Sequence, residues 1–250
     1  MSPTNFFKLQ DKNDTTFVNK NFPDESKFYY NTLEDAINNV SDKGTVYVEN
    51  GIFDEQLVIS KPLKLVGNNK SIVDLSGKSG ETIAIKINSS NVEIMNLTFK
   101  DCYIAIQAGT NDYSSSNILR NISLSNNTIS SCSIGLELYN SQNVTITNNK
   151  FSNFSKNSIY IPDAIDLINC SDYSIGSNYI NGKVPLDMIA CGIYLERCGH
   201  PDIYCNEFNN CRHSVCYRNM EDILNIDELN SYFNKFSNIL DPICNEESCQ

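Results

Sequence analysis

The feature that most constrains the fold is a short sequence repeat that occurs five times between Asn91 and Tyr217. Each copy alternates apolar and polar residues over five to nine positions and ends in a cluster of Asn, Ser or Gly, as in the segment 143–151. The apolar residues that close the copies lie 22 to 30 residues apart and are Phe99, Ile129, Phe151, Ile180 and Phe208. A period of this length is typical of repeat architectures.

The alternation predicts a short strand closed by a tight turn, because no copy has a helical period. A second short strand follows each turn, and these strands begin at Ile104, Ile134, Ala164, Gly192 and Ser214. Too few residues remain between the strands for crossover helices, so the units stack best as coils. The sequence therefore predicts an all-β fold, a right-handed parallel β-helix solenoid, with Asn residues stacked at its corners.

Both flanks of the repeats predict capping helices. Leu33, Ala36, Ile37 and Val40 share one helical face behind Thr32 as N-cap, and a helix here would cover the open end of the stack. Apolar residues recur at helical spacing in 221–240, up to Asp241-Pro242, and predict a C-terminal cap helix, with an oligomerisation helix as the alternative. The predicted domains are an N-terminal arm (1–30), the β-helix (31–219) and a cap helix with a Cys-containing tail (220–250).

The first coils carry a more specific pattern in residues 44–67. Gly-Thr-Val-x-Val-x-x-Gly-x-Phe-x-Glu, followed by Ile-x-Lys-x-Leu-x-Leu-x-Gly, resembles the start of proteins of the right-handed β-helix, pectin-lyase-like superfamily. The resemblance implies the fold but not the chemistry, because that superfamily includes lyases, esterases, hydrolases, tailspikes and non-enzymatic members. We interpret Glu55 and Lys61 of this pattern as structural residues.

Composition restricts the partners. The chain has 250 residues, 40% of them hydrophobic, and a formal net charge of −11, which does not fit nucleic-acid binding because phosphates require clustered Lys and Arg. The sequence has neither a signal-peptide pattern nor a run of 18 apolar residues, so we expect no membrane partner and a cytoplasmic or particle-associated protein. The expected partners are a polysaccharide or another protein, and the sequence does not indicate an oligomeric state.

The candidate site follows from aligning the second strands on their inward residues Ile106, Leu136, Ile165 and Ile193. Two outward rows result: Gln107, Glu137, Asp166 and Tyr194, and then Gly109, Tyr139, Ile168 and Glu196. Neighbours in one row lie roughly 4.8 Å apart, so Glu137 and Asp166 should repel or share a cation such as Ca²⁺. Asp163 and Arg197 lie near enough in the sequence to join them.

Carboxylates beside Tyr139 and Tyr194 are typical of a saccharide groove, with Glu196 as a further ligand-binding candidate. The alternative is a solvated β-face on which acids only confer solubility. The segment from Pro162 also resembles the Asp-Asp strand of polygalacturonases, in which Asp163 would match the second Asp.

The departures from that resemblance weigh against hydrolysis. Pro162 replaces the first Asp, Cys191-Gly192 stands in place of the expected Gly-His-Gly, and the Asn-Thr-Asp and Arg-x-Lys motifs are missing. The landmarks of pectin methylesterases are missing as well. We therefore predict a non-catalytic structural or glycan-binding module; the alternative is a polysaccharide hydrolase or lyase that uses Glu137, Asp163, Asp166 and Arg197.

The ten cysteines allow three interpretations. Cys102, Cys132 and Cys211 share one repeat position and Cys170 and Cys198 another, which favours buried reduced thiols, although disulfides between coils are geometrically feasible. A zinc site built from Cys198, His200, Cys211 and His213 is the weaker alternative, because Cys-x-His is not a usual zinc spacing. No other cofactor is expected.

Overall fold

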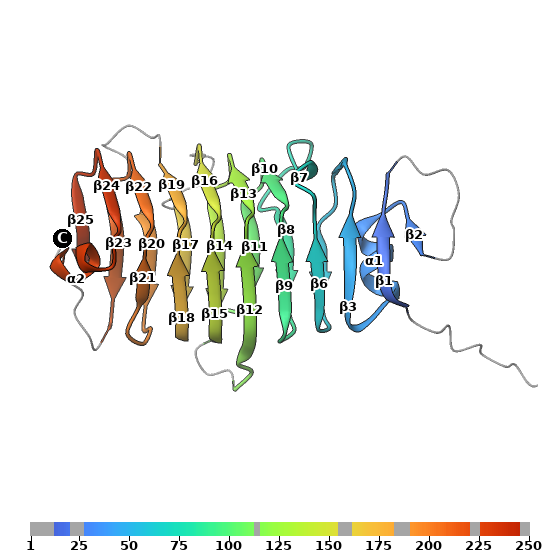
Figure 1. Ribbon diagram of the computed structural model, residues 1–250, viewed down its shortest axis with the longest axis horizontal. Coiled ribbons are helices and arrows are strands. Elements are labelled where there is room, and N and C mark those ends of the chain that lie inside the picture. The colour runs from blue at the N-terminus through green and yellow to red at the C-terminus, as the bar shows by residue number, and fades with distance from the viewer. Residues whose placement is uncertain are drawn as a thin grey trace, which may run out of the picture.

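In the computed structural model, the chain forms a stack of coils with three parallel sheets (Figure 1). The structure describes residues 13–20, 28–112, 116–154, 162–182, 191–220 and 226–245. Every strand pair among these residues is parallel. The prediction of an all-β parallel β-helix is confirmed.

Each full coil contributes one strand to each sheet, here called A, B and C. Sheet A contains, in spatial order, β2 (Tyr29–Tyr30), β1 (Asn13–Val18), β3 (Val40–Val48), β6 (Leu63–Val66), β9 (Val92–Met95), β12 (Leu119–Ser125), β15 (Ser141–Thr147), β18 (Ser171–Gly176) and β21 (Asp202–Tyr204). Sheet B contains β4 (Gly51–Phe53), β7 (Ser71–Asp74), β10 (Thr98–Lys100), β13 (Thr128–Ser130), β16 (Lys150–Ser152), β19 (Tyr179–Asn181), β22 (Glu207–Asn209) and β24 (Lys235–Ser237).

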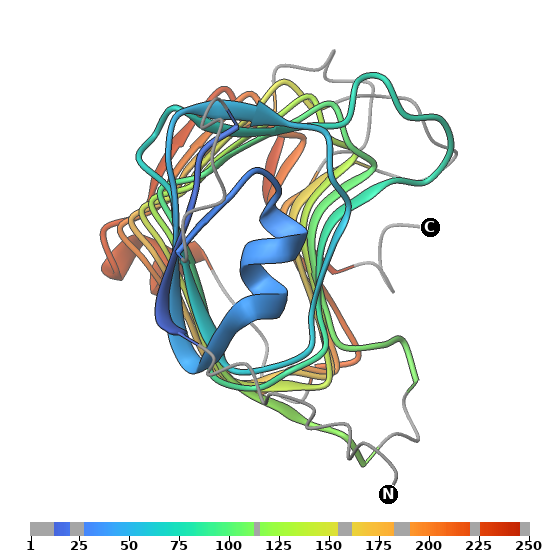
Figure 2. The ribbon, with the colours of Figure 1, turned by 90° about the vertical axis from the view of Figure 1, so that its right-hand side faces the viewer.

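Sheet C carries the strands on which the candidate site residues lie. It contains β5 (Leu57–Ile59), β8 (Ile83–Ile87), β11 (Ile104–Ala108), β14 (Ile134–Tyr139), β17 (Asp163–Ile168), β20 (Cys191–Glu196), β23 (His213–Arg218) and β25 (Asp241–Asn245). From the N-terminal end in Figure 2, the chain passes from sheet A to B to C clockwise as it recedes from the viewer, so the coil is right-handed.

The core fills the inside of the coils with aliphatic and aromatic rows. Ile106, Leu136, Ile165 and Ile193 of sheet C are fully buried and in register from strand to strand, as predicted. Leu138, Leu167 and Leu195 are also fully buried. Because alternate residues of a strand point to opposite faces, the residues between them point outward from sheet C.

A ladder of buried asparagines joins the coils at the corner that precedes sheet B, and consists of Asn127, Asn149, Asn178, Asn206 and Asn234. Each side-chain oxygen accepts hydrogen bonds from the previous rung; the Asn178 Oδ1, for example, lies 2.9 Å from the Asn149 N and 3.1 Å from its Nδ2. Each side-chain nitrogen donates to a carbonyl of sheet A, as Asn178 does to Ile146 (2.9 Å). This is the predicted stacking of Asn from coil to coil.

At the N-terminal end, α1 (Leu33–Asn39) lies across the opening of the stack (Figure 2). It contains Leu33, Ala36 and Ile37 of the predicted apolar face, and the Thr32 side chain accepts a hydrogen bond from the Asp35 N–H as the predicted N-cap. The arm prediction for residues 1–30 is partly wrong, because 13–18 form β1 and extend sheet A beside β3. Residues 1–12 and 21–27 of the predicted arm lie outside the described residues.

The predicted C-terminal cap helix over 221–240 is wrong. Helix α2 spans only Ile226–Ser231, and the chain then returns to the stack as β24 and β25, which pair with β22 and β23. The boundary at 220 therefore does not end the β-helix. Neither helix in the described part of the chain is long and apolar enough to cross a membrane.

Candidate functional site

The outer face of sheet C carries most of the residues predicted for a saccharide site. Gln107, Glu137, Asp166 and Tyr194 are register partners on β11, β14, β17 and β20, so the predicted row is present. The second predicted row is also present, since Tyr139 is the register partner of Ile168 and Ile168 that of Glu196. These strands fix the spacing of the side chains because each belongs to a continuous parallel ladder.

Glu137 and Asp166 are buried although they point outward from the sheet, since Glu137 is 8% exposed and Asp166 6%. Asp163, the first residue of β17, is 8% exposed. The Gln107 Nε2 donates a hydrogen bond of 2.6 Å to the Glu137 Oε2. The Asp163 Oδ1 accepts one of 2.8 Å from the Cys191 backbone N–H. Each of these two carboxylates therefore has a hydrogen-bond partner within the protein.

The aromatic and cationic candidates differ in position. Tyr139 is buried, whereas Tyr194 is half-buried and donates a hydrogen bond of 3.2 Å from its hydroxyl to the Glu196 Oε2. The side chain of Arg197 is 47% exposed, and its Nε lies 3.9 Å from the Glu196 Oε1. Arg197 follows β20 at a positive φ of 51°, so it occupies the corner rather than the row of acids.

The structure does not bring together the predicted zinc ligands Cys198, His200, Cys211 and His213. Cys198 and Cys211 belong to the buried core cluster. The His200 Nε2 instead lies 3.0 Å from the Glu228 Oε1 at α2. The Cys-x-His spacing misled because successive residues of a strand or corner point in different directions.

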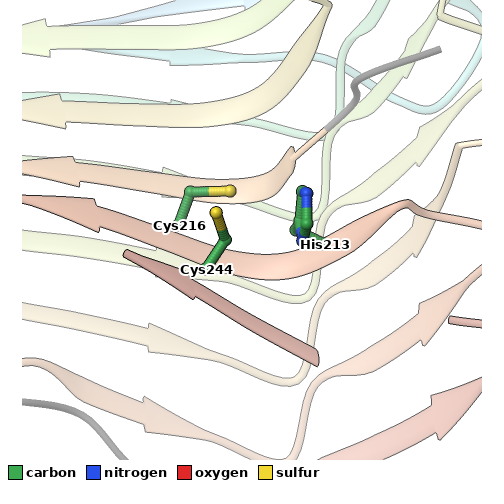
Figure 3. A group of neighbouring side chains, drawn as sticks. All are labelled: His213, Cys216 and Cys244. Atoms are coloured by element: carbon green, nitrogen blue, oxygen red, sulfur yellow. The ribbon is translucent and has the colours of Figure 1, made fainter. Parts of the chain in front are cut away.

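A different set of thiols and one imidazole does converge. His213, Cys216 and Cys244 have ligand atoms within 4.8 Å of one another, and all three are buried (Figure 3). Cys191 joins them, because its sulfur forms a disulfide with that of Cys216. Cys191 and Cys216 are not among the thiols for which the sequence favours the reduced form, and their disulfide joins two neighbouring coils.

The signal that would have identified this set is the coil register. Cys191 pairs with His213, and Cys216 pairs with Cys244. The sequence predicts a helix over 221–240 and places Cys244 in the tail behind it, so the alignment of the repeats does not include Cys244. Tyr194 packs against this cysteine cluster and separates it from the acidic part of the same row.

The other buried thiols lie at corners inside the stack, as predicted. The Cys102 and Cys132 sulfurs lie 2.8 Å apart, and this contact, together with burial, raises the pKa of Cys102. Burial raises the pKa of Cys211 to about 11. Thiols that resist ionisation in this way are poor nucleophiles, so these positions do not suit thiol catalysis.

Comparison with known proteins finds no matching family model and no matching curated protein. Among solved structures, a pectin methylesterase in complex with hexasaccharide VII is similar at 13% identity and a TM-score of 0.38, covering 82% of this chain and 78% of that one. A pectin methylesterase from Aspergillus niger has 12% identity and a TM-score of 0.38, with 97% and 87% covered.

A tailspike protein of Acinetobacter baumannii phage AM24 is also similar, at 13% identity and a TM-score of 0.41, over 83% of this chain and 48% of that one. At these identities and TM-scores, we draw no conclusion about activity or ligands from the similarity.

Proposed function

We propose that the chain is a non-catalytic β-helix that binds a polysaccharide along the outer face of sheet C. The observation that carries the proposal is the in-register row Gln107, Glu137, Asp166 and Tyr194. Each successive strand contributes one hydrogen-bonding or aromatic side chain at the same position. The spacing between neighbours is roughly 4.8 Å, the distance between adjacent strands.

Such a row suits a ligand that is itself a linear repeat. Carboxylate and amide groups bind sugar hydroxyls by hydrogen bonds, and the ring of Tyr194 offers an apolar face with a polar end. The hydroxyl of Tyr194 is oriented by Glu196, which limits the ring's freedom before a ligand binds. A side chain that is already ordered loses less entropy on binding.

The contacts of the carboxylates favour binding over catalysis. Glu137 is held by Gln107, and Asp163 by the backbone of Cys191, so one oxygen of each already has a structural partner. A general acid or base must instead reach the glycosidic oxygen or a water molecule. The missing polygalacturonase motifs support the same conclusion.

The binding test compares two tyrosines on different faces. Affinity electrophoresis of the purified protein through gels containing neutral or acidic polysaccharides should show retardation by at least one of them. Tyr194→Ala should abolish the retardation. Tyr179→Ala, a half-buried tyrosine on β19 of sheet B, is the matched control and should leave it unchanged. Equal loss in both variants, or no retardation of the parent protein by any polysaccharide, would contradict the proposal.

The activity test asks whether the acids act on the ligand. We expect no release of reducing or unsaturated ends from polygalacturonate, with or without Ca²⁺, and we expect polysaccharide affinity to survive Asp163→Ala. If ends are released and Asp163→Ala or Asp166→Ala stops the release, the protein is an enzyme and the non-catalytic assignment is wrong.

A further inference from the structure

Four side chains of the kind that bind zinc meet on the outer face of sheet C near its C-terminal end. They come from three neighbouring strands: Cys191 from β20, His213 and Cys216 from β23, and Cys244 from β25. Their exposed fractions are 3%, 8%, 1% and 4%. In Figure 3 the sulfurs of Cys216 and Cys244 and the ring of His213 lie around one small region.

The distances fit a tetrahedral metal site. The ligand atoms of His213, Cys216 and Cys244 all lie within 4.8 Å of one another. Around a tetrahedral Zn²⁺ with Zn–S bonds of about 2.3 Å, two sulfurs lie about 3.8 Å apart. Movements of about 1 Å are therefore enough to bring these atoms to zinc-binding distances.

The surroundings of His213 resemble the outer shell of a zinc site. Its Nδ1 lies 3.2 Å from the Asp241 carbonyl oxygen and 3.9 Å from the Asp241 Oδ2. A proton on Nδ1 satisfies this carbonyl and leaves Nε2 with the lone pair that a metal needs. Metal-binding histidines usually donate their other ring N–H to a carbonyl or carboxylate in this way.

We propose that the chain binds one Zn²⁺ through Cys191, His213, Cys216 and Cys244 when the Cys191–Cys216 disulfide is reduced. A Cys₃His set is a common structural zinc site. In the disulfide form the Cys191 and Cys216 sulfurs are bonded to each other. The site therefore alternates between a disulfide, which joins β20 to β23, and a zinc ion, which also holds β25.

The chemistry of the exchange balances with a dithiol as the reductant. The dithiol supplies two electrons and two protons, the Cys191–Cys216 S–S bond breaks to give two thiols, and the dithiol closes to its own cyclic disulfide. The thiols of Cys191, Cys216 and Cys244 then release three protons to solvent as their thiolates bind the metal.

The test begins with the whole protein and cobalt as a spectroscopic substitute for zinc. Protein reduced with dithiothreitol and freed of it without oxygen should bind one Co²⁺ per chain. Tetrahedral d–d bands and a thiolate charge-transfer band should appear, and one equivalent of Zn²⁺ should remove them. Oxidised protein should show neither. The absence of these bands from reduced protein, or equal bands from oxidised protein, would overturn the proposal.

Variants identify the ligands. Cys244→Ser and His213→Gln should each lower the zinc affinity of reduced protein at least tenfold. Cys205→Ser is the matched control, because Cys205 is exposed and lies outside the set, and it should leave the affinity unchanged. Circular dichroism checks that each variant is folded. A folded Cys244→Ser protein with the parental affinity, or a loss of affinity in Cys205→Ser, would show that zinc binds elsewhere.

Discussion

At the scale of the residue, one buried asparagine per coil joins each coil to its neighbours by hydrogen bonds. Asn178 accepts two hydrogen bonds from Asn149, and its Nδ2 donates to the Ile146 carbonyl and, at 3.0 Å, to the Asn206 Oδ1. It is 2% exposed, so water does not compete for these groups. The amide thus pairs backbone groups that the turn leaves without ladder partners.

We expect Asn178→Ala to lower the free energy of unfolding by about 3–5 kcal/mol, because several buried polar groups lose their partners at about 1–3 kcal/mol each. Denaturant titration measures the loss. Asn209→Ala is the control: its amide donates to the Glu207 carboxylate in an exposed pair, and the substitution should cost no more than about 0.5 kcal/mol. Similar losses in both variants would contradict this account of the ladder.

A buried thiol makes the stability depend on pH. Burial raises the pKa of Cys211 from 9.0 to about 11, so the folded state keeps a proton that the unfolded state loses above pH 9. The stabilisation that comes from this retained proton is fully present below pH 9 and is lost as the pH rises towards 11. One thiol shifted in this way contributes about 3 kcal/mol.

Cys211→Ala should therefore flatten the decline of unfolding free energy between pH 9 and 11, as measured by denaturant titration at several pH values. Cys205→Ala, at an exposed position, should decline as the parent does. The prediction fails if the parent and Cys211→Ala proteins decline in parallel.

At the scale of the element, α1 is held at both ends by residues of the first coil. The Glu55 carboxylate accepts hydrogen bonds from the Leu33 N–H (3.1 Å) and the Glu34 N–H (3.0 Å). The Lys61 Nζ donates to the carbonyls of Asn38 (3.1 Å) and Val40 (2.5 Å). Negative charge at the helix start and positive charge at its end both favour a helix of only seven residues.

Glu55→Ala should therefore destabilise the protein by about 1.5–3 kcal/mol, because charge-assisted hydrogen bonds to the helix start are lost. Thermal and denaturant unfolding measure the effect. Glu207→Ala, an exposed acid on β22, should be nearly neutral. An unchanged stability in Glu55→Ala would show that α1 is held by its apolar face alone.

The sequence predicts those elements best whose pattern has a single structural explanation. The alternation around Leu136 and Ile165 fixes both the inward row and its outward neighbours, since a slip of one residue would exchange the two faces. The C-terminal segment had two explanations. Phe233 and Phe236 fit a helical stripe, but Phe236 stacks on Phe208 as the next rung of sheet B, and Phe233 is 78% exposed.

The candidate site was predictable to the extent that it follows from the register. The sequence aligns Glu137, Asp166 and Tyr194 because their coils carry the same repeat of alternating apolar and polar residues. Cys244 was missed because it lies on β25, in a coil whose sequence also fits a helix. The hydrogen bond that joins Asp163 to Cys191 depends on side-chain orientation, which no sequence pattern specifies.

At the scale of the whole molecule, the C-terminal end of the stack depends on its last two strands. Strands β24 and β25 cover the edges of β22 and β23, and the Phe236 ring covers that of Phe208, with ring centroids 5.5 Å apart. A chain shortened to residues 1–220 would expose both the unpaired edge and an apolar interior. Such edges pair with other chains.

We expect the 1–220 chain to self-associate and the 1–245 chain to behave like the parent in size-exclusion chromatography with light scattering. Association of the shortened chain should increase with protein concentration. A monodisperse 1–220 monomer with the parental melting temperature would show that the last coil is dispensable.

The asparagine ladder also bears on how such a molecule can change its length during evolution. Each coil contacts the coils on either side of it through the same bonds, so a coil can be lost or duplicated as a block without altering the cross-section. Loss of residues 150–178 would join Asn149 directly to Tyr179, in the sequence context of the next rung. A gene that gains or loses such blocks would lengthen or shorten the protein by one strand spacing at a time.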